Sequence, residues 1–170
     1  MSLPLAEAAD LHWALALADN AVLWWGLAAC GIAQLSKLVI ELVQHRRWNP
    51  KVLVETGGMP SSHSALLTGT AAALGWQQGF ADPLFALAAT MCFVVLYDAS
   101  GVRRAAGLTA ERVNGLAGQT ELKPLKENLG HTRLEVLVGS LMGPAVALPG
   151  LVWLGSPLAL AQHWGWLPIG

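Results

Sequence analysis

Four long apolar stretches, separated by shorter polar connections, dominate the pattern of hydrophobic and polar positions along the chain. They cover roughly residues 21–43, 61–78, 83–100 and 134–154. Each is long enough to cross a bilayer as a helix, which satisfies its backbone polar groups internally. The pattern therefore predicts an all-α fold, a polytopic membrane helical bundle with about four transmembrane helices.

Two further segments flank these spans. A mildly amphipathic stretch covers residues 7–18, and a tryptophan-containing tail covers residues 157–170. Segments of this kind can lie in the plane of the membrane interface instead of crossing it. At 170 residues the chain suits one domain, so we expect a single membrane domain over residues 1–170.

The composition supports a membrane protein. The chain is 54% hydrophobic and only 12% charged, with a mean hydropathy of +0.48, which is more apolar than a soluble domain of this size. Its net charge of -1 indicates no nucleic-acid partner. The N-terminus lacks the basic start and cleavage site of a secretory signal. Cys30 and Cys92 lie in apolar runs, and we expect both to be free, buried thiols.

The basic residues predict the orientation. All ten lie between Lys37 and Arg133, and none falls in the connection at residues 79–82 or at either terminus. By the positive-inside rule the basic loops are cytoplasmic and both termini lie outside, in what we expect to be the bacterial inner membrane. An aromatic belt at the outer end is consistent with this, since it would hold Trp13, Trp24, Trp25, Trp76, Trp153, Trp164 and Trp166.

A turn with phosphate-binding chemistry precedes the second span: Gly57-Gly58-Met59-Pro60-Ser61-Ser62-His63-Ser64. The first turn of a helix has free N–H groups and the positive end of the helix dipole, and serines add donors there. We therefore interpret Ser61 and Ser62 as phosphate-binding residues, with His63 as a titratable group beside them. The pattern is also typical of an ordinary serine N-cap followed by an incidental histidine.

Charged residues of two other spans fall at the same end. An ionisable residue within a span, such as Lys37, indicates function, although pairing with Glu41 or snorkelling would also explain it. Asp98 suits either a substrate contact or a structural ion pair with Lys37 or Arg103. Arg103 and Arg104 suit phosphate binding or a positive-inside anchor.

A second histidine stands at the start of the fourth span. Glu135 lies one helical turn after His131 and can hold its imidazole in one tautomer, which makes the histidine a competent nucleophile toward phosphorus. His63 then supplies the proton that the leaving oxygen needs. Thr132 and Glu135 also fit a capping box, which is the structural alternative for Glu135. Two histidines ringed by basic residues suit phosphoryl transfer better than a metal site.

Three motifs occur in order along the chain: Met59-Pro60-Ser61-Ser62-His63-Ser64, Tyr97-Asp98-Ala99-Ser100-Gly101-Val102-Arg103-Arg104, and Lys126-Glu127-Asn128-Leu129-Gly130-His131 followed by Glu135-Val136. They resemble the divergent branch of the type-2 phosphatidic acid phosphatase and vanadium haloperoxidase superfamily, over roughly residues 22–150. The resemblance implies that His131 is the nucleophile, with Glu135 in place of an aspartate. It also implies that His63 is the general acid, with Ser62 in place of a glycine.

The resemblance further implies a set of phosphate-binding cations. Lys37 matches the start of the family's first motif, whose arginine position holds Gln44 here. Leu125 stands where an arginine usually precedes the nucleophile, with Lys126 beside it. We expect Arg103 or Arg104 to replace one missing cation.

Together these observations predict an integral membrane phosphatase that hydrolyses a lipid or isoprenoid phosphate monoester, or a pyrophosphate, at the cytoplasmic face. The expected catalytic residues are His131, His63 and Glu135. The expected substrate-binding residues are Lys37, Ser61, Ser62, Asp98, Arg103, Arg104 and Lys126. The expected partners are a lipid-phosphate substrate and the bilayer, and we expect no metal or other cofactor.

Two other classes of function stay open. A protein that binds an anionic lipid or phosphate headgroup without hydrolysing it would carry the same cations. A small transporter would need polar residues through the depth of the membrane, and the outer halves of the spans hold few.

Small residues recur every four positions in two of the spans. This spacing lets helices approach closely, either within the chain or in a homodimer, and the sequence leaves both open. The residues are Ala65, Gly69 and Ala73 in one span and Gly139, Gly143 and Ala147 in the other.

Overall fold

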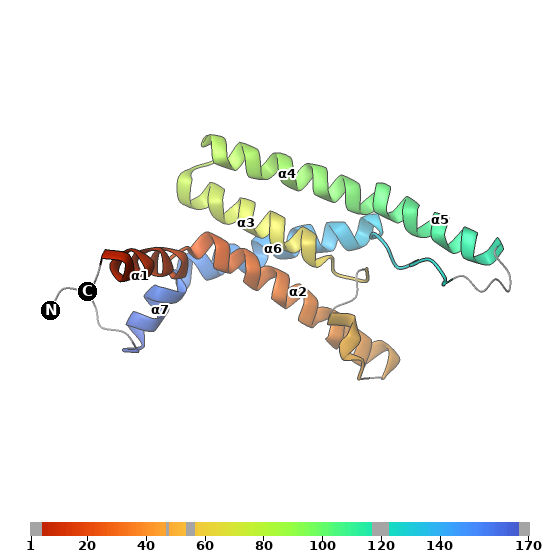
Figure 1. Cartoon of the computed structure of the whole chain (residues 1–170), viewed down its shortest axis with the longest axis horizontal. Coiled ribbons are helices and arrows are strands. Elements are labelled where there is room, and N and C mark those ends of the chain that lie inside the picture. The colour runs from red at the N-terminus through yellow and green to blue at the C-terminus, as the bar shows by residue number, and fades with distance from the viewer. Residues whose placement is uncertain (1–4, 47, 54–56, 117–122, 167–170) are drawn as a thin grey trace.

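Helices account for every regular element that the computed structural model describes, in residues 5–46, 48–53, 57–116 and 123–166 (Figure 1). The expected all-α class is therefore confirmed for these residues. In chain order the elements are α1 (Leu5–Ala18), α2 (Ala21–His45), the short 3-10 helix η1 (Pro50–Leu53), α3 (Ser62–Gln78), α4 (Pro83–Ser100), α5 (Val102–Leu116), α6 (Arg133–Trp153) and α7 (Pro157–His163).

Helix α3 forms the centre of the bundle, where it packs against α6, α2 and α4. Its contact with α6 depends on glycine. A Cβ on Gly143 would lie 2.5 Å from the carbonyl oxygen of Ala65 and 2.6 Å from the nitrogen of Gly69. A Cβ on Gly139 would clash with the backbone of Ser61. The small residues spaced by four therefore serve packing between α3 and α6 within one chain.

Among the residues that the structure describes, three helical stretches are long and apolar enough to cross a bilayer: Ala21–Gln44, Pro83–Leu116 and Arg133–Trp153. Their outward side chains include exposed Val39, Phe93 and Leu141, as expected for a surface that faces lipid. The expectation of about four spans is close to this. Helix α3, expected as a span, has only 17 residues, begins with a Ser-rich turn and is packed among the other helices.

The sequence predicts a basic loop between the third and fourth spans, which includes Arg103, Arg104 and Arg112. The structure corrects this: α5 begins directly after Gly101 and continues beyond the end of α4 (Figure 1). Its buried residues, Gly107 and Ala110, lie three positions apart on one face. The segment therefore has the periodicity of an amphipathic helix, with small residues on its buried face and charged residues on its exposed face.

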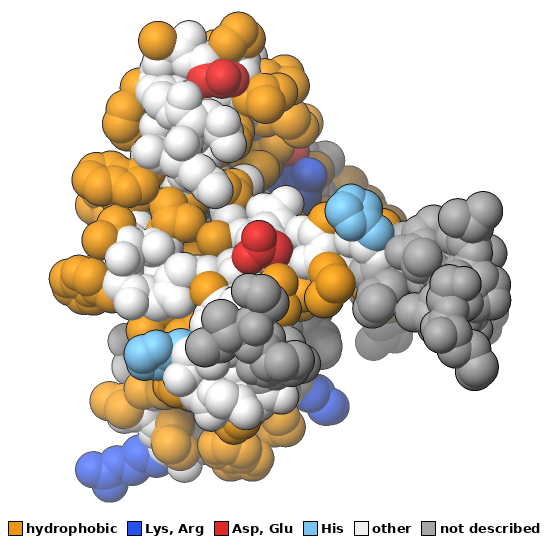
Figure 2. All heavy atoms as spheres, turned by 90° about the vertical axis from the view of Figure 1, so that its left-hand side faces the viewer, with side chains coloured by type: hydrophobic (Ala, Val, Ile, Leu, Met, Phe, Trp, Pro, Cys, Tyr) orange, Lys and Arg blue, Asp and Glu red, His pale blue; other side chains and the backbone are white. Residues whose placement is uncertain are grey.

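The opposite end of the bundle holds α1, α7 and the connection between α3 and α4 (Figure 1). Figure 2 shows this end as a mostly hydrophobic and uncharged surface. The indole nitrogen Nε1 of Trp25 donates to the carbonyl oxygen of Gly155 at 2.7 Å, and the hydroxyl of Ser156 donates to Asp19 at 2.6 Å. This end is held together without the clustered histidines and basic residues of the other end.

Candidate active site

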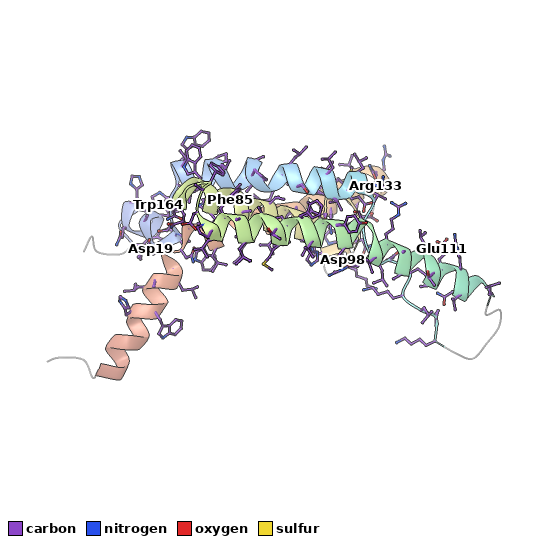
Figure 3. The ribbon with its side chains drawn as sticks, turned by 90° about the horizontal axis from the view of Figure 1, so that it is seen from above. Asp19, Phe85, Asp98, Glu111, Arg133 and Trp164 are labelled. Carbon is purple, nitrogen blue, oxygen red and sulfur yellow. The ribbon has the colours of Figure 1, made fainter. Side chains whose placement is uncertain are left out.

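Backbone hydrogen bonds bring three of the four predicted polar segments together at one end of the bundle. The amide of His131 donates to the carbonyl oxygen of Ala99 at 2.9 Å, which joins the start of α6 to the end of α4. The amide of Ser61 donates to the carbonyl oxygen of Glu135 at 3.1 Å, which joins the start of α3 to α6. Figure 3 shows Asp98 and Arg133 at this same end.

Lys37 brings the remaining segment, α2, to the same place. It is 7% exposed, and its Nζ donates to the carbonyl oxygen of Gly57 at 3.0 Å. Gly57 and Gly58 both have positive φ, which glycine adopts without strain. The glycine pair therefore lets the chain turn over the ammonium group before α3 begins.

His131 and Glu135 form the central pair. His131 is 7% exposed, and its Nδ1 lies 3.1 Å from Oε2 of Glu135. The same Oε2 accepts a hydrogen bond from the amide of Thr132 at 3.1 Å, while the Thr132 hydroxyl accepts from the amide of Glu135 at 3.2 Å. Glu135 thus completes the capping box of α6 and orients the imidazole, which leaves Nε2 of His131 as its free ring nitrogen.

His63 lies in the first turn of α3 and is exposed. Lys37, Arg103 and His131 lie close enough for their charges to act on its imidazole, so the two histidines and two of the cations form one electrostatic cluster. Glu135 acts in the opposite sense on Lys37, because its negative charge attracts the ammonium group. This cluster contains the charge types that a phosphoryl-transfer site requires.

The two serines before His63 are buried. Ser61 is fully buried, and its Oγ caps α3 by accepting from the amide of Ser64 at 3.3 Å and from the Ser64 hydroxyl at 2.8 Å. Ser62 is 3% exposed. The structure therefore places Ser61 as the helix N-cap that holds His63 in position, which is the alternative its sequence pattern left open.

The expected cations differ in their placement. Arg103 is exposed, and its Nε donates to Oδ2 of Asp98 at 2.6 Å, which realises the structural pairing considered for Asp98. Arg104 lines a cavity beside His131. Lys126 is exposed and does not line that cavity.

A cavity of about 520 Å³ adjoins the His131–Glu135 pair. Its lining combines cations, carboxylates and amides with apolar side chains such as Ile40 and Leu129. It includes Lys37, Glu41, Gln44, Arg104, Glu127, Asn128, His131, Thr132 and Glu135. The cations and amides in this lining offer hydrogen-bond donors to an anionic group, and the apolar side chains offer contacts to an apolar one.

Sequence reasoning missed Asn114, which holds one wall of this cavity. Its side chain bonds Leu125 and Glu127 in the segment that leads to His131. The available signal was its position four residues after Ala110 and seven after Gly107, on the small-residue face of an amphipathic stretch.

Comparison with known proteins gave two matches. The sequence model of the Divergent PAP2 family matches residues 18–146. The chain is also 35% identical over 149 residues to a Bacillus subtilis (strain 168) protein described as "Uncharacterized membrane protein YuiD". The aligned region covers 78% of this chain and 94% of that relative. No solved structure matches the chain.

Proposed function

The chain belongs to the Divergent PAP2 family, and on this premise we propose that it is a membrane phosphatase acting on a lipid or isoprenoid phosphate monoester at the cytoplasmic face. The observation that carries the proposal is the buried His131, held through Nδ1 by Glu135 beside a cavity that Lys37 and Arg104 also line. A histidine oriented in this way presents Nε2 as a nucleophile, and the carboxylate stabilises the positive charge that develops on the ring.

In the first step Nε2 of His131 attacks phosphorus and forms a P–N bond. The P–O bond to the alcohol breaks, and its electron pair goes to the leaving oxygen. His63, as imidazolium, gives that oxygen its proton, so the alcohol leaves neutral. Lys37 and an arginine, Arg104 or Arg103, hold the phosphoryl oxygens as charge builds on them.

In the second step water attacks the phosphohistidine. Neutral His63 takes a proton from this water as the new P–O bond forms. The P–N bond then breaks, its electron pair returns to His131, and inorganic phosphate leaves. In this proposal Ser61 and Ser62 fix the first turn of α3, and Asp98 positions Arg103.

Phosphate release from a panel of lipid phosphates tests the proposal, with purified protein in detergent, EDTA present and vanadate as competitor. We expect vanadate-sensitive release that His131→Ala lowers by at least about 10³-fold, with His163→Ala as the matched control at an exposed histidine on α7. Rapid quenching in alkali should trap a phosphohistidine in the wild type. Near-normal release by His131→Ala would reject the nucleophile, and release abolished by EDTA would reject the metal-independent route.

A second candidate is binding of an anionic headgroup without hydrolysis. It draws on the same observation, since Lys37 and Arg104 line the cavity beside His131 and could hold a headgroup whether or not hydrolysis follows. Binding of a lipid phosphate in nanodiscs that survives His131→Ala, with no release by the wild type, would select this function.

A further inference from the structure

The segment at residues 123–130, called here the return segment, leads from α5 to the nucleophile. Figure 1 shows it running back beside α5 to the start of α6. It has no helix or strand of its own. Since Glu127, Asn128, Leu129 and Gly130 all line the cavity, whatever holds this segment also shapes the site.

Asn114 holds the far end of the return segment through every group of its amide. Its Nδ2 donates to the carbonyl oxygen of Leu125 and to Oε1 of Glu127, both at 2.8 Å. Its Oδ1 accepts from the amide of Leu125 at 2.9 Å. Because the Leu125 bonds involve both its N–H and its C=O, they fix the backbone and not only a side chain.

Two glycines allow the rest of the segment to lie against the helix. A Cβ on Gly107 would lie 2.6 Å from the carbonyl oxygen of Glu127 and 2.9 Å from that of Leu129. Gly130 has φ +75°, and a Cβ there would clash with the backbone of Arg104. The contact points therefore move back along α5 toward its start as the segment approaches His131.

We propose that α5 acts as a splint for the active site, meaning that it fixes the backbone of the return segment. Asn114 is then a positioning residue, which sets the cavity wall formed by residues 127–130. Arg104 lines the cavity from α5, and Glu127 lines it from the return segment. Asn114 acts through Glu127 and its neighbours and touches no substrate itself. It thereby affects how well a lipid phosphate fits the cavity, a specificity role that rests on the proposed function.

The splint is tested by amide hydrogen exchange of the full-length protein in nanodiscs, without any substrate. We expect Asn114→Ala to speed exchange at Leu125 by about tenfold, because its N–H loses its acceptor. Thr109→Ala is the matched control, since that hydroxyl bonds only Ala105 within α5. Unchanged exchange at Leu125 in Asn114→Ala, or equally fast exchange in Thr109→Ala, would overturn the splint.

A rescue separates the specific contact from general loosening of α5. Asn114→Asp keeps an acceptor for Leu125 but sets a carboxylate against Glu127, so exchange should rise. The double variant Asn114→Asp with Glu127→Gln restores the hydrogen bond to residue 127 but leaves the carbonyl oxygen of Leu125 without its donor, so we expect it to restore part of the protection that Asn114→Asp loses. Failure of the double variant to restore protection would contradict the proposed contact.

The specificity role is tested by kinetics on the best lipid phosphate from the panel. We expect Asn114→Ala to raise KM about tenfold, while vanadate inhibition stays unchanged because the phosphate-binding groups do not move. An unchanged KM, or an equal loss of vanadate affinity, would overturn this role. If the wild type hydrolyses nothing, the proposed function and the specificity role fail together, while the exchange experiment still decides the splint.

Discussion

At the scale of single residues, the side chain of Glu135 takes part in two interactions at once. Its Oε2 accepts from the amide of Thr132 and lies within hydrogen-bond distance of Nδ1 of His131. The capping box and the oriented histidine, considered as alternatives from the sequence, coexist because a carboxylate oxygen has two lone pairs. Helix formation at the start of α6 therefore also positions the imidazole.

This double role predicts that the two contributions can be separated. Glu135→Gln keeps the cap, since glutamine also serves at this position, but removes the negative charge beside His131. We expect kcat to fall by about 10²–10⁴-fold with little change in thermal stability. Thr132→Ala should do the reverse, costing about 1 kcal/mol of stability while kcat is largely kept. Equal effects of both variants on kcat would contradict this separation.

At the scale of helices, the close contact of α3 and α6 holds two parts of the site in register. Ser61 stands before His63 on one helix, and its amide bonds the carbonyl oxygen of Glu135 on the other. Gly139 and Gly143, where α6 crosses α3, let the two backbones approach closely. The distance between the starts of α3 and α6, which carry the two histidines, therefore depends on glycines outside the site.

Gly143→Ala should therefore destabilise the protein. The added Cβ meets backbone atoms of Ala65 and Gly69, which cannot rotate away as a side chain would. We expect a loss of about 1–3 kcal/mol in the free energy of unfolding, measured by thermal unfolding in detergent with tryptophan fluorescence. Gly31→Ala on α2 is the matched control, because a Cβ there meets nothing within 4 Å. A similar melting temperature for both variants would contradict the packing role.

At the scale of the whole molecule, the two ends of the bundle differ in chemistry. One end gathers His63, His131, Lys37 and Arg103. The other end is mostly hydrophobic and uncharged (Figure 2). The distribution of basic residues predicts that the first end faces the cytoplasm. An active site on that side would meet substrates of the inner leaflet.

The orientation is checked by cysteine labelling in intact cells with a membrane-impermeant maleimide. We expect Ala81→Cys, at the exposed connection between α3 and α4, to be labelled from outside. Lys51→Cys on η1 should react only after permeabilisation. The parent protein controls for Cys30 and Cys92, which lie half-buried and buried within helices. Labelling of Lys51→Cys alone in intact cells would reverse the orientation.

The hydrophobic pattern by itself determined the long helices and their ends, because crossing a bilayer and capping a helix depend on neighbouring residues. Local spacing likewise determined the pairing of His131 with Glu135, since residues four apart share a helix face.

Only the tertiary structure decided that Arg103 pairs with Asp98 while Arg104 reaches the cavity. Adjacent residues on a helix point in directions about 100° apart, so packing, not sequence position, selects which one meets a distant site. The contacts of Asn114 could not be predicted from the sequence either. They join residues 11 and 13 positions apart, and the segment that contains Leu125 and Glu127 has no helical or strand periodicity from which to predict them.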